Sequence, residues 1–229
     1  WDVSSWESLT AGVAIAGQQN NPLSGFRCEC GSIEQYAGIV TRTMPSASFE
    51  RITFRLAWLH ALADGLFDSK ITIINPPRAL EQSIDKSAAL MRLSHLGVAT
   101  PATRFVQSRH DAMAAYDELG PDCVITPLFG GEGRGVIRVT DRELAWTAFS
   151  ALDQLDAVHQ IQTFVPPGGC DTRCLVIGRY VVGYRRQNAS GFRSNVSAGA
   201  GCEPATIPPE LRKLARQIAS AFGLLVASV

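Results

Sequence analysis

The sequence predicts a protein that combines α/β and α+β architecture, with more than one subdomain along its 229 residues. The order strand, helix, strand over 37–43, 49–67 and 70–77 is typical of a parallel α/β unit. Over 103–140, short apolar runs that indicate strands alternate with a helical stretch at 111–119. An apolar content of 46% is enough for a sizeable core.

The stretch after the second strand predicts one long helix over 78–97. Leu80, Ile84, Ala88 and Met91 recur at helical spacing, and Gly97 is a typical helix end.

The later elements follow from the same patterns. Strands are predicted at 103–107, 122–128, 135–140 and 159–165, and helices at 141–155 and 209–222. The segments DTRCLVIG and RYVVGYRRQ predict a hairpin that turns at Gly178 and Arg179. The helix at 209–222 carries an apolar face, and LLVASV predicts a last strand.

The charge balance narrows the classes of partner. Lys plus Arg number 21 and Asp plus Glu number 21, so no overall field attracts nucleic acid or an anionic membrane, and any anion site must be local. No apolar run reaches the roughly 18 residues of a membrane helix, and the N-terminus lacks a signal-peptide pattern. The six cysteines form no paired CxxC motifs, which favours reduced thiols in a cytoplasmic protein. The first residue, Trp1, suggests that the numbering starts inside a longer protein.

The segment ITPLFGGEGRGV, residues 125–136, packs four glycines between two predicted strands. It lacks the GK[ST] ending of a Walker loop, and no helix follows as in a dinucleotide fingerprint. Glycines let backbone N–H groups approach phosphate oxygens without a Cβ in the way. Two interpretations stay open, a phosphate-binding loop and a plain hairpin connection. In the first, we expect that only bound phosphate offsets the entropy lost when the loop is fixed.

Several motifs then occur in a fixed order: NPPRALEQSIDKSAAL, PLFGGEGRGV, QTFVPPGGCDTRCLVIG, YRRQ and GFRSNVSAGAG. This order resembles the RimK-like branch of the ATP-grasp ligases, of the alpha-L-glutamate ligase type, from about residue 38 onward and with both ends truncated. The resemblance implies an ATP-grasp fold, in which two α+β subdomains clamp a nucleotide. It divides the chain into a partial α/β pre-ATP-grasp domain (1–77), a central subdomain with the glycine-rich loop (78–163) and a truncated C-terminal subdomain (164–229).

The resemblance also implies a reaction. The enzyme phosphorylates a carboxylate with ATP, and an amine then displaces phosphate from the acyl phosphate. The implied partners are ATP, an amino acid (glutamate is favoured) and a carboxylate acceptor, which is a small cofactor or a protein C-terminus. A homo-oligomer is compatible with this picture. The protein's main task in such chemistry is to stabilise charge around phosphates.

Site residues follow from the resemblance, position by position. Cofactor-binding roles are implied for phosphate-contacting, loop and adenine-hinge positions: Lys86, Thr126, Gly130, Gly131, Glu132, Gly133, Arg134, Gly135, Gln162, Thr163, Phe164, Val165, Asp171, Arg185 and Arg186. Catalytic roles are implied for Arg173, Arg193 and Asn195. The alternative for Lys86 is an ordinary helix lysine that is exposed to solvent. Asp171 and Arg173 lie two apart on one strand face, so a structural ion pair is their alternative.

The chain departs from the family pattern at three places. Thr126 stands where the family usually has a second ATP-contacting lysine, and Thr163 stands where it usually has glutamate. Arg134 and Arg138 are the two candidates to replace the missing lysine. The Mg²⁺ ligands are expected downstream of Val229, so no residue here is assigned to metal. The alternative function is therefore a non-catalytic, degenerate nucleotide-binding protein, and we expect residues 1–229 alone to be inactive.

Overall fold

The computed structural model describes residues 2–12, 25–41, 44–66 and 71–229, and helices and sheets alternate through these ranges. The predicted mixed architecture is confirmed. Each sheet lies within one of the three predicted ranges: β1–β3 and β4–β5 in the first, β6–β9 in the second and β10–β13 in the third. The ranges themselves stay a prediction as domain boundaries.

The N-terminal part contains the predicted parallel unit. Strands β4 (Gly38–Val40) and β5 (Thr72–Ile74) pair in parallel, and α1 (Phe49–Ala63) lies between them in sequence. The ends of the predicted segments, 42–43 and 67–70, lie outside the described residues. A small antiparallel sheet that the sequence did not predict packs Phe26 edge-on against Trp58 of α1, with ring centroids 5.5 Å apart. Its strands are β1 (Thr10–Gly12), β2 (Gly25–Cys28) and β3 (Gly31–Ser32), with 3-10 turns at Trp6–Ser8 and Ile33–Gln35.

The single helix predicted over 78–97 is wrong. Two helices, α2 (Pro77–Ile84) and α3 (Lys86–His95), are separated by Asp85, which has an extended backbone. The Asp85 carboxylate accepts hydrogen bonds from the backbone N–H groups of Ser87 and Ala88, at 2.8 and 3.2 Å. Aspartate is a favoured N-cap because it satisfies these free donors. The break makes Lys86 the first residue of α3, while Met91 is 61% exposed rather than packed.

The central part is a four-stranded antiparallel sheet in the order β6-β9-β7-β8. Its strands are β6 (Thr103–Val106), β7 (Cys123–Thr126), β8 (Ile137–Val139) and β9 (His159–Thr163). Helices α4 (Arg109–Leu119) and α5 (Arg142–Asp153) cover one face, where Ile125, Phe149 and Ile161 are buried together. Because side chains alternate along a strand, the opposite face, here called the inner face, carries Val124, Thr126, Gln160 and Gln162.

The C-terminal part is a second antiparallel sheet in the order β12-β11-β10-β13. The predicted hairpin is present as β10 (Cys170–Ile177) and β11 (Tyr180–Gln187), and Gly178 supplies the positive φ of its turn. Strands β12 (Gly201–Pro204) and β13 (Val226–Ser228) flank it. Helix α6 (Pro209–Ala221) packs Ala215 and Ala219 on one face of this sheet.

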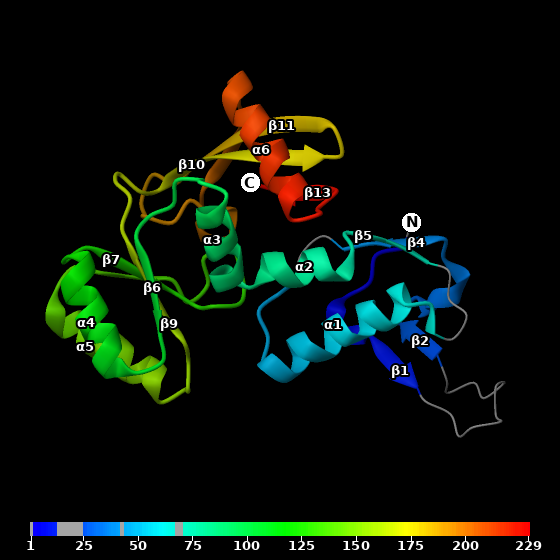
Figure 1. Cartoon of the computed structure of the whole chain (residues 1–229), viewed down its shortest axis with the longest axis horizontal. Helices are drawn as coiled ribbons and strands as arrows, with labels where there is room; N and C mark the ends of the chain where they lie inside the picture. The colour runs from blue at the N-terminus through cyan, green and yellow to red at the C-terminus, as the bar shows by residue number, and fades with distance from the viewer. Residues whose placement is uncertain (1, 13–24, 42–43, 67–70) are drawn as a thin grey trace.

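One buried side chain joins the first part to the last. Asn75, at the end of β5, accepts hydrogen bonds from the N–H groups of Leu225 and Val226, both at 2.9 Å, and donates to the Val226 carbonyl at 2.8 Å. Figure 1 shows α2 and α3 between the N-terminal part and the two later sheets. Within the described ranges, the helices are too short or too polar to cross a bilayer.

Candidate active site

The glycine-rich segment connects two antiparallel strands, β7 and β8, as the sequence predicted. The connection, residues 127–136, is called the glycine loop below. Lys86 Nζ donates to the carbonyls of Pro127, Leu128 and Gly130, at 2.6, 3.3 and 2.8 Å. Burial lowers the pKa of Lys86, and the neighbouring Asp85 carboxylate opposes this shift. Lys86 is therefore not a solvated helix lysine, because its ammonium group holds the root of the loop.

The tip of the glycine loop contacts the segment that follows β11. Ser197 Oγ, in the short 3-10 turn Val196–Ala198, donates to the Glu132 carbonyl at 2.8 Å. Gly133 has a φ of 73°, and a Cβ there would collide with Asn195 Oδ1. Only glycine allows both this backbone conformation and this approach. The expectation that only bound phosphate holds the loop was incomplete, since it left out Lys86 and Ser197.

Arg193 lies against the far end of the same loop. Its Nη2 donates to the Val136 carbonyl, and its guanidinium carbon lies 5.0 Å from the Phe192 ring centroid. Its Nε is buried without a hydrogen-bond partner. The loop thus meets a cation at each end, Lys86 at its start and Arg193 at its finish.

Asp171, Arg173 and Arg186 form a charged cluster on one face of the C-terminal sheet. Arg186 Nε donates to Asp171 Oδ1 at 2.8 Å and its Nη2 donates to Oδ2, while Arg173 Nε reaches Oδ2 at 3.3 Å. Ser194 Oγ donates to the same carboxylate at 2.7 Å. Burial raises the pKa of Asp171, but the hydrogen bonds from Arg186 and Ser194 and both positive charges outweigh it, so the net pKa is lowered. The ion pair that was the alternative for Asp171 and Arg173 is therefore present, and it fixes the direction of both guanidinium groups.

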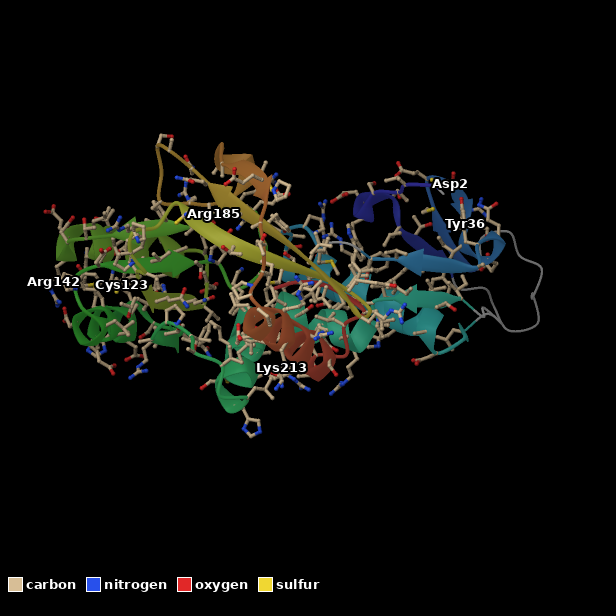
Figure 2. The ribbon with its side chains drawn as sticks, turned by 90° about the horizontal axis from the view of Figure 1, so that it is seen from above. Asp2, Tyr36, Cys123, Arg142, Arg185 and Lys213 are labelled. Atoms are coloured by element: carbon tan, nitrogen blue, oxygen red, sulfur yellow. The ribbon has the colours of Figure 1, made fainter. Side chains whose placement is uncertain are left out.

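Arg185 and Arg186, two arginines given cofactor-binding roles by the resemblance, point to opposite faces of the sheet. Adjacent residues of a strand point to opposite faces, and Arg185 shares its face with Val181, which packs in the core under α6. Figure 2 shows Arg185 on the long β10–β11 hairpin, toward the end that lies beside the central sheet. Arg185 is exposed there and lies on the opposite face from the Asp171 cluster.

The predicted adenine hinge, Gln162–Val165, begins at the end of β9. The backbone N–H groups of Thr163 and Phe164 donate to the carbonyls of Ala102 and Asp122, both at 3.0 Å. These two donors are therefore occupied, and base recognition falls to the remaining backbone groups of this segment. The Phe164 ring lies 6.4 Å from Phe192 and 3.5 Å from the Arg138 guanidinium carbon, which links the hinge to the Arg193 segment.

Of the two arginines proposed to replace the missing lysine, Arg138 is held by a carboxylate, whereas Arg134 forms only an ion pair between exposed side chains. Arg138 forms two hydrogen bonds of 2.7 Å with the Asp122 carboxylate, and Arg134 pairs with Glu132 at 3.0 Å. Thr126 lies on the inner face, and its buried hydroxyl has no hydrogen-bond partner.

Sequence reasoning missed three residues of this region. Ser194 and Ser197 bind the charged cluster and the glycine loop, and both lie in the GFRSNVSAGAG motif, although no contact was assigned to either. Gln160 is buried on the inner face directly opposite Thr126. Strand alternation could have revealed it, because it lies two residues before Gln162.

The carboxylates at hand do not fit a magnesium ion. Mg²⁺ binds oxygen ligands in octahedral geometry, usually through one or two free carboxylates. The two carboxylates of the predicted site, Asp171 and Glu132, are both paired with arginines. In the part of the chain that the structure describes, no three His, Cys, Asp or Glu side chains come together as a metal site.

Comparison with known proteins gives a consistent result. A family model described as the RimK-like ATP-grasp domain matches residues 83–229. The chain is 28% identical over 232 residues to a tetrahydromethanopterin:alpha-L-glutamate ligase of Methanosarcina acetivorans, covering 96% of this chain and 70% of the relative. It is 33% identical over 159 residues to a probable alpha-L-glutamate ligase of Trichodesmium erythraeum, covering 68% of this chain and 53% of the relative.

Solved structures support the fold. A RimK domain ATP-grasp protein from Sphaerobacter thermophilus superposes with a TM-score of 0.63 at 22% identity, covering 89% of this chain and 69% of that one. The ATP-grasp ligase PsnB, solved with a minimal precursor, Mg and ADP, superposes with a TM-score of 0.58 at 19% identity, covering 97% of this chain and 70% of that one. The family model spans the glycine loop, the hinge and the Asp171 cluster together. The chain therefore belongs to the RimK-like ATP-grasp family.

Proposed function

We propose that this chain carries the nucleotide site of an ATP-dependent carboxylate–amine ligase, which adds glutamate or a similar amino acid to a carboxylate through an acyl phosphate. One observation carries the proposal: the glycine loop is contacted by Lys86 at its start and by Arg193 at its end, from segments more than a hundred residues apart. A plain hairpin connection needs no such cations. Two relatives named as glutamate ligases support the choice of amine.

The roles of the side chains follow from their positions. Lys86 and Arg193 neutralise phosphate oxygens next to the loop, and the glycines let backbone N–H groups approach the same oxygens. Arg173 and Arg186, held by Asp171, present always-charged forks for the transferred phosphoryl group and the acyl phosphate. Asn195, beside Gly133, orients the same group. The carboxylate oxygen attacks the γ-phosphorus of ATP, ADP leaves, and the neutral amine then attacks the acyl carbon and expels phosphate.

Hydroxylamine trapping tests this function without knowledge of the natural amine. An acyl phosphate reacts with hydroxylamine to give a hydroxamate, which is detected by colour or mass. We expect a longer form of the protein that also carries the Mg²⁺ ligands to form hydroxamates only with ATP and a competent carboxylate from a panel of cofactor and peptide acids, and residues 1–229 alone to form none. Glutamate should suppress the trapping by competition. Arg173→Met should abolish the signal, while Arg185→Met, on the other face, should keep it.

A non-catalytic nucleotide-binding protein is the second candidate. Thr126 on the inner face favours it, because no described cation takes the place of the lysine expected there. The two candidates differ in outcome. Binding of ADP by the longer form without hydroxamate formation from any acid of the panel supports the binding protein and contradicts the ligase.

A further inference from the structure

Two polar side chains lie opposite each other on the inner face, each with an unpaired buried atom. Gln160 in β9 is 3% exposed, and its Oε1 has no hydrogen-bond partner. Thr126 in β7 is its cross-strand partner in the sheet register, and the buried Thr126 Oγ1 has no partner either. Because buried polar atoms are nearly always hydrogen-bonded in native proteins, two such atoms side by side indicate a place for a polar ligand group.

The position of the pair ties it to the nucleotide site. The neighbours of Gln160 in β9, His159 and Ile161, lie on the α4–α5 side of the sheet, so Gln160 points the other way. Thr126 directly precedes Pro127, whose carbonyl accepts the 2.6 Å hydrogen bond from Lys86. The pair therefore lies at the root of the glycine loop.

The chemistry of the pair selects a particular kind of ligand edge. The glutamine Oε1 only accepts a hydrogen bond and its NH₂ group only donates, while a threonine hydroxyl does either. A glutamine amide matches the amino group and N7 of adenine in a two-bond contact. Guanine presents two acceptors, O6 and N7, on the same edge, so one of them would face the glutamine oxygen without a proton between them.

We propose that Gln160, supported by Thr126, is a specificity-determining residue that binds the amino-N7 edge of adenine and selects adenine over guanine nucleotides. This inference rests on the proposed function, since it needs a nucleotide beside the glycine loop. The adenine amino group has two hydrogens. One points to the N7 edge and the Gln160 oxygen, and the other points to the backbone carbonyls of the hinge.

Binding of ADP and GDP by calorimetry tests the proposal. The full chain should bind ADP at least about tenfold more tightly than GDP, the size of one well-made hydrogen bond. Gln160→Met keeps the length of the side chain and removes its amide, so ADP affinity should fall about tenfold, while GDP affinity should stay the same or rise because the repulsion from the glutamine oxygen is lost. Gln154→Met is the matched control, because Gln154 is exposed at the end of α5 and should leave both affinities as they are.

The outcomes separate this proposal from the one it rests on. If the unaltered chain binds no adenine nucleotide, both proposals fail. If it binds ADP and Gln160→Met keeps the same ratio of ADP to GDP affinity, only the role of Gln160 is wrong, and the side chain is structural. Where Gln160→Met does not fold, Thr126→Val, which keeps the side-chain shape, should lower the ratio about threefold. An unchanged ratio in Thr126→Val would equally overturn the inference.

Discussion

Replacing Lys86 with methionine tests what holds the glycine loop in place. The lysine ammonium group has three N–H donors, and three loop carbonyls accept them, two at short distance (2.6 and 2.8 Å) and one at 3.3 Å. Hydrogen bonds from a charged group contribute about 1.5–3 kcal/mol each, but they are not additive, and methionine avoids the desolvation of a buried charge. We expect the closed loop to lose about 2–4 kcal/mol relative to open forms.

Amide hydrogen exchange measures this loss directly. Local opening controls exchange in such loops, and each 1.4 kcal/mol is a factor of ten, so protection of the 128–136 amides should fall roughly thirtyfold to several hundredfold. Lys213→Met is the matched control, because Lys213 lies exposed on α6, where Figure 2 labels it. Equal loop protection in the two variants would refute the reasoning and leave Ser197 and Arg193 as the contacts that hold the loop.

Three further predictions concern single side chains. Thr126→Lys should tighten ADP binding at least about tenfold in calorimetry, because a lysine side chain is long enough to extend from the adenine edge toward the phosphates, whereas Thr126→Met should not tighten it. Weaker binding by the lysine variant would show that β7 lies away from the phosphates. Asp171→Asn should lower the free energy of unfolding by about 2–3 kcal/mol at pH 7. The pKa of Asp171 is lowered in the folded protein, so the difference in the free energy of unfolding between the two proteins should be complete above about pH 4. It should shrink as the pH falls through the folded pKa. A difference that does not depend on pH in denaturant titrations would contradict this prediction. Asn75→Ala removes three hydrogen bonds to residues 225–226 and should lower the same free energy by about 2–4 kcal/mol, against no measurable change for the exposed Gln154→Ala.

Elements were predicted correctly from the sequence where one local rule decides the structure. The β10–β11 hairpin needed only two alternating runs and Gly178 between them, and both strands appear as expected. The long helix over 78–97 failed because apolar spacing continues across Asp85, whereas the N-cap bonds of that residue start a new helix. Helical spacing of apolar residues alone cannot distinguish one helix from two consecutive helices that continue the same spacing. The preference of aspartate for the N-cap position was the better signal.

The roles of the site residues stay predictions, and the hydrogen bonds among these residues were not foreseen from the sequence. Lys86, the loop glycines, Arg193 and Asn195 do come together, although they are spread over a hundred residues. That Lys86 holds loop carbonyls depends on three-dimensional distances, which no spacing rule gives. The separation of Arg185 from Arg186 could have been predicted, since strand alternation already places the two side chains on opposite faces.

The charge of the site decides whether a polyphosphate can still bind with Thr126 in place of lysine. Four cations gather there, Lys86, Arg173, Arg186 and Arg193, and two carboxylates oppose them: Asp171, and Asp85 beside Lys86. Four minus two leaves two positive charges, and Glu132 and Arg134 cancel each other. The partners of Lys86 and Arg193 are backbone carbonyls, which satisfy hydrogen bonds without neutralising charge. When phosphate oxygens replace those carbonyls, the two cations keep their hydrogen bonds and gain charge pairing, while the released carbonyls need other donors. The glycine loop therefore lies between cations that bind phosphate more strongly than they bind the loop, and this favours a nucleotide site over a structural hairpin.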